Sequence, residues 1–222
     1  MKITCTQENL NKGVNLVARV ASTKASLPVL GNILLETQKG RLALSATDLE
    51  IGVRTLVGAK IDDEGAITLP ARLLLEFVSQ TNDPKIEIKV EGDSAELKSE
   101  HYQAKIKGIS ASEFPPLPQT KEGKFFKISA AELKEGIEQT VFAAAQDETR
   151  PVLGGILIKA QKDQLKMVAT DSYRLSEKKI KLEGNKEDFE VVVPSRTLLE
   201  VARIIEQDLK LAQLFLGENQ LR

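Results

Sequence analysis

The 222-residue sequence has one cysteine and one histidine, and these low counts exclude two kinds of site. Cys5 has no partner for an internal disulfide, and we interpret it as a small side chain in a first strand. His101 cannot serve a multi-histidine metal site, and a lone histidine in a strand-like segment is usually a surface residue. Phosphate-binding patterns such as G-x-x-x-x-G-K-[ST] are also absent. We therefore expect no catalytic residue, no metal and no cofactor.

Long apolar segments are absent too. No hydrophobic run approaches the roughly 18–20 residues of a membrane span, and residues 1–13 lack the apolar core of a signal peptide. Hydrophobic residues make up 41% of the sequence and charged residues 28%, a balance typical of globular proteins. These features predict a cytoplasmic protein.

The sequence has no excess of either charge. Its 31 Lys and Arg residues face 32 Asp and Glu residues, so the net charge is −1. A protein that holds nucleic acid by neutralising phosphates normally carries a marked basic excess. Either nucleic acid is not the partner, or something other than affinity retains it.

A long internal repeat is the strongest feature that is present. Residues 28–48 read PVLGNILLETQKGRLALSATD and residues 151–171 read PVLGGILIKAQKDQLKMVATD, with 12 of 21 positions identical. PARLLLE at 70–76 returns as PSRTLLE at 194–200. The offsets of 123 and 124 residues are too long for a solenoid, whose units run about 20–50 residues. The sequence therefore predicts a duplicated domain.

Within each copy, the hydrophobic periodicity predicts a strand, a helix and three strands, and this unit occurs twice. In the first copy we expect strands at 2–6 and 66–69 and helices at 7–21 and 71–81. In the second copy we expect a helix through Ala144 and a last helix at 195–207. This is an α+β fold with two helices on sheets in each domain. The proline-rich stretch 113–123 suggests domains at 1–118 and 125–222 joined by a linker at 119–124.

Basic residues recur on the outer faces of the predicted helices. Arg196, Glu200 and Arg203 follow one side of the last helix, and Lys12 and Arg19 follow the first. A solvated face with ordinary ion pairs explains this pattern most simply. The alternative is a sparsely basic surface for a polyanion.

Asp48 and Asp171 follow Ala-Thr in both copies. Equivalent positions of two tandem domains lie far apart, so these carboxylates cannot form a catalytic pair. Turn formation, in which the Asp side chain accepts bonds from nearby backbone N–H groups, is the simpler interpretation.

Several motifs in register resemble one family. The first copy contains STKASLPVLGNILLE, SATDLEIGVRT, LPARLLLEF and SEFPPLP, and the second contains DETRPVLGGILI, VATDSYRLS and VPSRTLLEV. Together they resemble the first two domains of the bacterial DNA polymerase III beta subunit family. These proteins are DNA sliding clamps, which are rings of pseudo-repeated domains with the DNA-clamp fold that encircle duplex DNA and tether the polymerase.

The resemblance implies how this chain meets DNA. Helices line the hole of such rings, and topology retains the DNA, so a near-neutral protein with a thin basic lining is suitable. The contacts would be to the backbone, without sequence preference. The residues implied in DNA contact are Lys12, Arg19, Lys24, Arg72, Lys134, Arg150, Arg196 and Arg203.

The resemblance also implies a peptide pocket on the second domain. Family partners, including the DNA polymerase III catalytic subunit and the clamp loader, insert a short peptide of the type Gln-Leu-x-Leu-Phe. The positions that match here are Leu153, Thr170, Ser172, Tyr173, Arg174 and Leu175. The family residue at position 172 is often glycine. Without the resemblance, Tyr173 and Leu175 would be interpreted as plain strand residues.

The family chain has a third domain, for which this sequence has no counterpart. The second copy also lacks a match to roughly the last 20 residues of the first, which predicts two missing strands and an open sheet edge. The hypothesis is that the sequence is a fragment or a truncated product. The family's ring interface maps onto the edge around Ala104 and Ile106. Gln213–Leu216 echoes a clamp-binding peptide, but it lies where the repeat predicts a core strand.

Two alternatives remain. Two domains per chain could build a six-domain ring as a trimer, whereas the family ring is a dimer of three-domain chains. A duplicated protein-binding scaffold that never encircles DNA is the other alternative.

Overall fold

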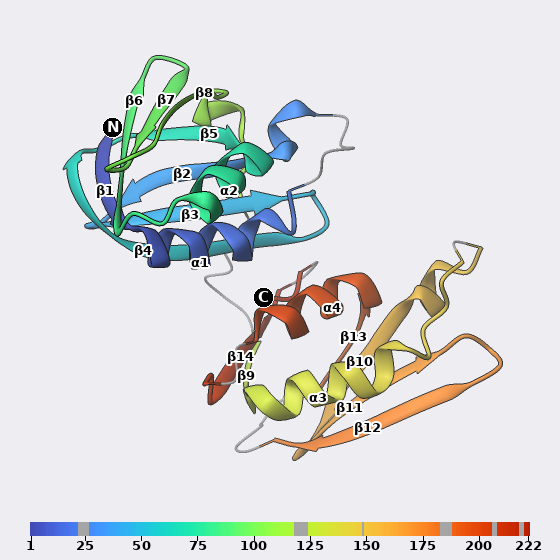
Figure 1. Cartoon of the computed structure of the whole chain (residues 1–222). Coiled ribbons are helices and arrows are strands. Elements are labelled where there is room, and N and C mark those ends of the chain that lie inside the picture. The colour runs from blue at the N-terminus through green and yellow to red at the C-terminus, as the bar shows by residue number, and fades with distance from the viewer. Residues whose placement is uncertain (22–26, 118–123, 148, 183–187, 206–207, 218–219) are drawn as a thin grey trace. The chain divides into compact units, whose positions relative to one another are not determined.

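The structure is a computed structural model of the whole chain, and it describes all residues except 22–26, 118–123, 148, 183–187, 206–207 and 218–219. The chain divides into two compact units, Met1–Leu117 (unit 1) and Pro118–Arg222 (unit 2). Each unit is built of helices laid on β-sheet (Figure 1). The predicted α+β fold with a tandem repeat is confirmed.

Unit 1 contains the predicted set of a strand, a helix and three strands twice. Its eight strands form one sheet in the order β5-β2-β3-β4-β1-β6-β7-β8. The first set of elements is β1 (Lys2–Thr6), α1 (Gln7–Ala18), β2 (Asn32–Gln38), β3 (Arg41–Thr47) and β4 (Gly52–Asp63). The second is β5 (Ala66–Pro70), α2 (Ala71–Gln80), β6 (Lys85–Glu91), β7 (Ser94–Lys98) and β8 (Gln103–Lys107). Short 3₁₀ helices η1 (Pro28–Gly31) and η2 (Ala111–Glu113) complete it.

Unit 2 repeats this plan with fewer strands. Its sheets have the orders β12-β11-β10-β13 and β14-β9. Its elements are β9 (Lys124–Ser129), α3 (Ala130–Val141), η3 (Pro151–Gly154), β10 (Gly155–Gln161), β11 (Gln164–Thr170), β12 (Leu175–Lys181), β13 (Phe189–Pro194), α4 (Ser195–Ile204) and β14 (Leu211–Leu216). Among the described residues, β14 is the one strand after α4, where unit 1 has three.

Three of the four helices end several residues before the sequence predicted. After α1, the N–H of Val20 bonds to the carbonyl of Val17, and after α3 that of Ala144 bonds to Val141. Both are i→i−3 bonds, so the last turn tightens and the α-helix stops. The hydrophobic periodicity of the sequence extends past these helix ends because the side chains of the following turns still pack inward. The prediction for α4 extended to residue 207, and 206–207 lie outside the described residues.

Inward-pointing and outward-pointing side chains alternate along the strands, and the inward-pointing ones form the core. Ile3 and Cys5 point inward from β1 and are buried, as the interpretation of Cys5 required. Burial raises the pKa of the Cys5 thiol to about 11, so it remains a protonated, unreactive group at neutral pH. Gln213–Leu216 lies in β14, and Leu214 is buried, which confirms the core strand expected there.

Each unit seats its first helix on the sheet through a glycine. A Cβ added to Gly13 of α1 would lie 2.5 Å from Cγ2 of Val57, and one added to Gly136 of α3 would lie 2.9 Å from Sδ of Met167. The two glycines are 123 residues apart, the offset of the repeat. The helix backbone therefore rests directly on the sheet in both copies.

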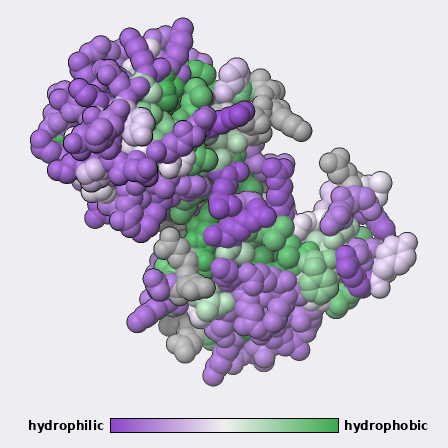
Figure 2. Space-filling model, in the orientation of Figure 1, coloured by the Kyte–Doolittle hydropathy of each residue, from purple (hydrophilic) through white to green (hydrophobic). Residues whose placement is uncertain are grey.

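The surface is mixed in character. Most of the face seen in Figure 2 is hydrophilic, with apolar areas exposed on both units. In the described part of the chain, every helix is too short or too polar to cross a membrane.

Gly13→Ala tests the close packing of α1. Alanine favours a helix by about 1 kcal/mol over glycine, but overpacking against Val57 and Leu44 costs about 1–3 kcal/mol. We expect a net loss of unit 1 stability in urea unfolding followed by circular dichroism. The matched control is Asn15→Ala on the exposed side of α1, which should not destabilise. A Gly13→Ala protein as stable as wild type would contradict the packing argument.

Candidate DNA-facing and peptide-docking surfaces

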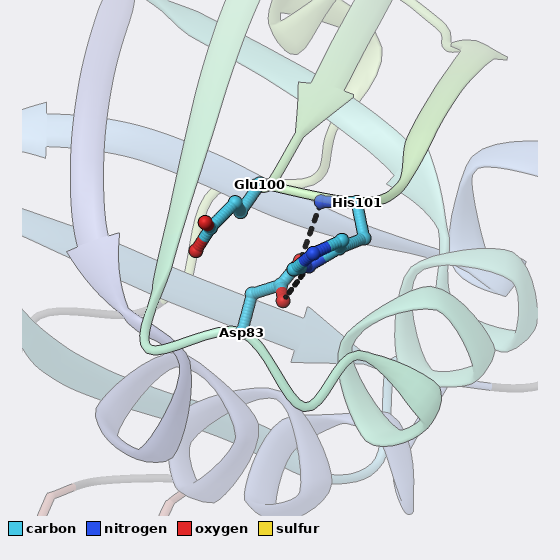
Figure 3. A group of neighbouring side chains, drawn as sticks. All are labelled: Asp83, Glu100 and His101. Atoms are coloured by element: carbon cyan, nitrogen blue, oxygen red, sulfur yellow. Dashed lines mark hydrogen bonds and ion pairs between the residues drawn. The ribbon is translucent and has the colours of Figure 1, made fainter.

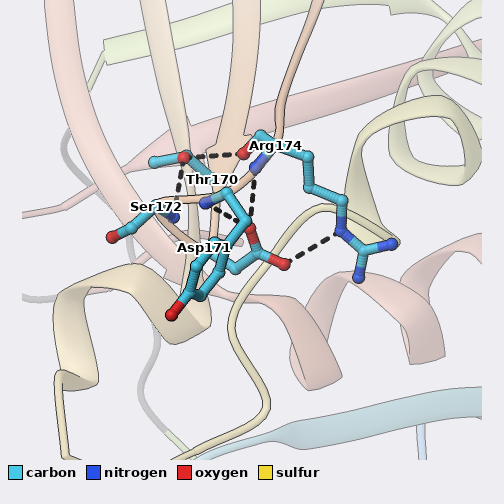
Figure 4. Close-up of polar contacts among 5 residues, drawn as sticks. Thr170, Asp171, Ser172 and Arg174 are labelled. Atoms are coloured by element: carbon cyan, nitrogen blue, oxygen red, sulfur yellow. Dashed lines mark hydrogen bonds and ion pairs between the residues drawn. The ribbon is translucent and has the colours of Figure 1, made fainter.

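A tight turn follows the third strand of the first β-α-β-β-β set in each unit, which is β3 in unit 1 and β11 in unit 2, and the Thr-Asp pair builds it. In unit 2 the hydroxyl of Thr170 accepts the N–H of Ser172 at 3.1 Å and donates to the carbonyl of Arg174 at 2.7 Å. A carboxylate oxygen of Asp171 accepts the N–H groups of Tyr173 and Arg174, both at 3.0 Å (Figure 4). The backbone N–H groups of Arg174 and Tyr173 lower the pKa of Asp171.

Unit 1 repeats this turn with different residues. Thr47 and Asp48 accept the N–H groups of Leu49 and Ile51, at 3.0 and 2.8 Å. Leu49 and Ser172 both have a φ of 78°, the left-handed region in which glycine is the least strained residue. Both aspartates therefore hold turns, which agrees with the structural interpretation of the Ala-Thr-Asp repeat.

The turn of unit 2 presents exposed apolar side chains. Tyr173 is 95% exposed, Leu175 is 67% exposed and Val152 is 70% exposed. The guanidinium of Arg174 lies 5.7 Å from the centre of the exposed Phe142 ring. Large apolar groups gathered on a surface mark interaction sites. We name Phe142, Val152, Leu153, Tyr173 and Leu175 the unit 2 apolar surface.

Hydrogen bonds connect the predicted pocket residues. Arg150 donates to the hydroxyl of Ser172 at 2.9 Å, and its carbonyl accepts the N–H of Leu153 at 3.0 Å. The turn bonds join Thr170, Ser172 and Arg174. The structure therefore places all six predicted pocket residues in one region, and Leu153 is half-buried.

The sequence prediction missed Phe142 and Val152. Phe142 follows the end of α3, and its counterpart by the repeat offset is the basic Arg19. Val152 belongs to the repeated PVLG motif, and Val29 and Leu30 are the buried residues of its first copy. Only the difference between the two copies could have identified these residues.

The predicted DNA-contact residues lie mostly on exposed helix surfaces. Arg19 caps the end of α1, Arg72 begins α2, and Arg196 and Arg203 lie on α4, all four exposed. In the described part of the chain, no ion pair joins Arg19, Arg72 or Arg196 to an acidic residue. Lys24 lies outside the described residues.

The other predicted basic residues already have intramolecular contacts. Lys12 pairs with Glu8 at 2.8 Å, and Arg203 pairs with Glu200. Lys134 donates to the carbonyl of Ile205 at 3.3 Å, which ties α3 to the end of α4. These contacts are surface pairs of small energy, so they do not prevent binding of a polyanion.

The helix surfaces also carry acidic residues. Glu132, Glu135 and Glu138 are exposed on α3, and Glu135 pairs with Lys178 of β12 at 2.8 Å. The resulting surface is only thinly basic, which is consistent with the overall charge of −1.

Comparison with known families identifies the repeat. The DNA polymerase III beta subunit N-terminal domain family matches residues 1–118, and the central domain family of the same subunit matches residues 127–222. The chain belongs to the DNA polymerase III beta subunit family.

Relatives and solved structures agree. The chain is 39% identical to a beta sliding clamp of Synechococcus elongatus over 92% of this chain and 56% of that protein. It is 30% identical to the beta sliding clamp of Bacillus subtilis, and this match covers 100% of this chain and 61% of that protein. Solved clamps of B. subtilis and Pseudomonas aeruginosa superpose with TM-scores of 0.96 and 0.95, at 29% and 30% identity, and each match covers 100% of this chain and 61% of that chain. The predicted family and clamp fold are confirmed.

The strand edge predicted to join clamp subunits is β8. This strand ends the unit 1 sheet, and its outer edge has no partner strand in the described residues. Ile106 is 6% exposed and points into the unit's own core, while Ala104 is half-buried. A partner strand would therefore bond to the backbone edge and not to the side chain of Ile106.

His101 does not lie in a strand, which corrects the sequence interpretation. It lies in the turn between β7 and β8, where its N–H and Nδ1 bond to the two oxygens of Asp83 at 2.8 and 2.7 Å (Figure 3). The Ser99 hydroxyl and then His101 lower the pKa of Asp83 to about 2, and Asp83 raises the pKa of His101. Glu100 lies near both, but Asp83 already uses both oxygens to hold the turn.

The Asp83–His101 pair predicts a pH-dependent contribution to stability. The pKa of His101 is raised above its ordinary 6.5, so its contribution is complete below pH 6.5 and is lost as pH rises through the folded pKa. The pKa of Asp83 is lowered, so its contribution to stability is complete above pH 3.8 and is lost as pH falls toward 2. We expect the thermal unfolding temperature to decline as pH rises through the pKa of His101, and we expect His101→Gln to abolish this decline.

Because the chain has one histidine, NMR titration of its ring reports the pKa without overlap. Asp83→Asn is the control and should return the pKa toward 6.5. A wild-type midpoint at or below 6.5 would refute the pairing.

Proposed function

We propose that this chain forms two domains of a DNA sliding clamp, which encircles duplex DNA and tethers the replicative polymerase and other replication and repair proteins. Membership of the beta subunit family through both repeats supports this most strongly. The domains would extend over 1–118 and 125–222, joined at 119–124. In this function the chain is an accessory subunit in the cytoplasm, and polymerase activity belongs to its partner.

The charge distribution supports topological retention. Each phosphate contact adds affinity but also resists sliding, so a ring needs few of them. The predicted DNA residues Lys12, Arg19, Lys24, Arg72, Lys134, Arg150, Arg196 and Arg203 would give such a thin lining, interrupted by the acids of α3.

Retention on circular but not on linear duplex DNA tests encirclement. The DNA-free scaffold alternative requires no retention on either form. The chain spans 56–61% of the length of the sliding clamps compared above, so ring closure depends on how copies meet at the β8 edge around Ala104 and Ile106. Light scattering separates a monomer, which needs further chain to close, from a trimer of two-domain chains.

The double substitution Arg72→Ala and Arg196→Ala should weaken binding to a short labelled duplex. The slope of log affinity against log salt should fall by about 0.9 for each phosphate that is no longer neutralised. Fluorescence anisotropy at several salt concentrations measures both quantities. The control is Arg54→Ala on β4, because Arg54 pairs with Glu36 at 3.2 Å on the strand face turned away from α1. An equal effect of Arg54→Ala would contradict the assignment of the helix surface.

The unit 2 apolar surface is the proposed site for partner peptides. Leu153 and Leu175 would supply apolar walls, Tyr173 and Arg174 would flank the peptide, and the backbone after Thr170 and Ser172 would hold its polar end. The exposure of these apolar side chains in a turn held by hydrogen bonds supports a preformed site.

Val152→Asp should abolish most of this binding, because a buried carboxylate without a partner is costly. We expect affinity for a fluorescein-labelled Gln-Leu-Ser-Leu-Phe peptide to fall at least about tenfold. Phe125→Asp is the matched control, since Phe125 is an exposed aromatic residue on β9 of the same unit. If both substitutions weaken binding equally, the peptide binds by general hydrophobicity and not at this surface.

A further inference from the structure

Three lysines lie in one row across the four-stranded sheet of unit 2. Lys159 of β10 is directly opposite Lys166 of β11, and Lys166 is directly opposite Lys179 of β12. Side chains that alternate with them, such as those of Met167 and Ile180, are buried under α3. The three lysines therefore point to the face of the sheet that α3 does not cover (Figure 1). We name them the lysine row.

Two carboxylates serve the three lysines of this row. Glu190 of β13 pairs with Lys159 at 2.7 Å. Glu177 of β12 is shared between Lys166, at 3.9 Å, and Lys179, at 3.2 Å. Like charges directly opposite each other on neighbouring strands destabilise a sheet. The row therefore keeps a positive charge that its own glutamates do not neutralise.

Unit 1 shows that the fold does not require this charge. At the repeat offset of 123 residues, the counterparts are Glu36 of β2, Ala43 of β3 and Leu56 of β4, in the same register. None of them is basic. Leu56 is 49% exposed although unit 1 has the complete set of strands, so this part of the sheet face lies at the surface of the complete repeat. The lysine row follows from residue identity and register, and not from the number of strands in unit 2.

The spacing of the row indicates the shape of an acidic partner. Neighbouring strands lie about 4.8 Å apart, so the outer two lysines are about 10 Å apart across the sheet. Acidic residues at i, i+4 and i+7 of an α-helix form a row that spans about 10.5 Å, at 1.5 Å per residue. Alternate residues of an extended strand are about 6.7 Å apart, so three of them span about 13 Å. A helix laid across the strands matches the row better than an extended peptide does.

The same face is poorly suited to nucleic acid. Proteins that bind single strands combine basic residues with aromatic side chains on which the bases stack. In the described strands β10–β13, no aromatic side chain points to this face. Glu177 and Glu190 would also lie against a continuous chain of phosphates, whereas separate carboxylates can take positions between them.

We infer that the lysine row docks an acidic helical segment of a partner protein, with its carboxylates at i, i+4 and i+7. These carboxylates complete the charge balance of Lys159, Lys166 and Lys179. Glu190 lies opposite Lys159 at one end of the row and excludes a further carboxylate there, which sets the register of the helix. The row contains none of the residues proposed to contact DNA, so the inference goes beyond the proposed function and does not depend on it.

The combined substitutions Lys159→Gln, Lys166→Gln and Lys179→Gln test the row while they keep long polar side chains on the sheet. The probe is a fluorescein-labelled, alanine-based helical peptide of about 20 residues with glutamates at i, i+4 and i+7. Fluorescence anisotropy at low salt measures its affinity. We expect this triple variant to bind the peptide at least about tenfold more weakly than wild type, because three surface ion pairs are lost.

The matched control combines Lys2→Gln, Lys60→Gln and Lys89→Gln on strands of unit 1. It changes the net charge equally, and each of its lysines has a carboxylate partner. We expect it to bind the peptide as wild type does. A second peptide, with the same three glutamates on different sides of the helix, should bind wild type more weakly. Equal losses in the two triple variants, or equal binding of the two peptides, would overturn the inference, because net charge alone would explain the binding.

Two further measurements on folded wild-type protein locate the contact. Peptide-induced NMR shifts of backbone amides should concentrate on β10, β11 and β12, and shifts confined to the helices would overturn the inference. A labelled oligothymidine that binds at the row in place of the peptide would overturn it too. Val152→Asp should leave binding of the acidic peptide unchanged. A failure at the lysine row therefore leaves the proposed partner site intact, and a failure of that site leaves this inference intact.

Discussion

Direct contact between a helix backbone and a sheet is the constraint on which each unit depends. Gly13 and Gly136 bring α1 and α3 so close to the strands below them that a single added carbon would collide with core side chains. At this distance the apolar stripe of the helix is fully buried, and α2 or α4 can pack beside it on the same sheet. The charged side of each helix is then held outward as a defined surface.

In the proposed function, that outward surface would allow a protein of almost zero net charge to move along DNA. Basic residues are spread over the four helices, and exposed acidic residues lie among them on α3. Few and scattered phosphate contacts would favour movement along a polyanion over tight binding. The family relationship implies DNA as a partner, whereas the net charge of −1 does not favour strong phosphate binding. In the proposed function the two agree, because the ring itself retains the DNA.

Duplication supplied two copies of a turn, and the two copies carry different side chains on the same backbone. Both Thr-Asp turns keep the same hydrogen bonds and the same left-handed residue, because the backbone geometry requires them. The side chains around the turns are under no such constraint. In unit 1, Leu117 packs over Gly52, whereas the equivalent position in unit 2 carries the large apolar side chain of Leu175.

The sequence by itself determined the repeat, the order of helices and strands, the buried stripes and the role of Asp48 and Asp171 in turns. These follow from local periodicity and from hydrogen bonds between residues a few positions apart. The predicted helix ends were less accurate, because side chains continue to pack inward past the last α-helical hydrogen bond. Only the tertiary structure decided that His101 holds a turn through Asp83, that Ile106 is buried, and that Val152 is exposed while Val29 is covered. Each of these depends on contacts between residues distant in the chain, such as Leu117 with Gly52, and no local pattern records such contacts.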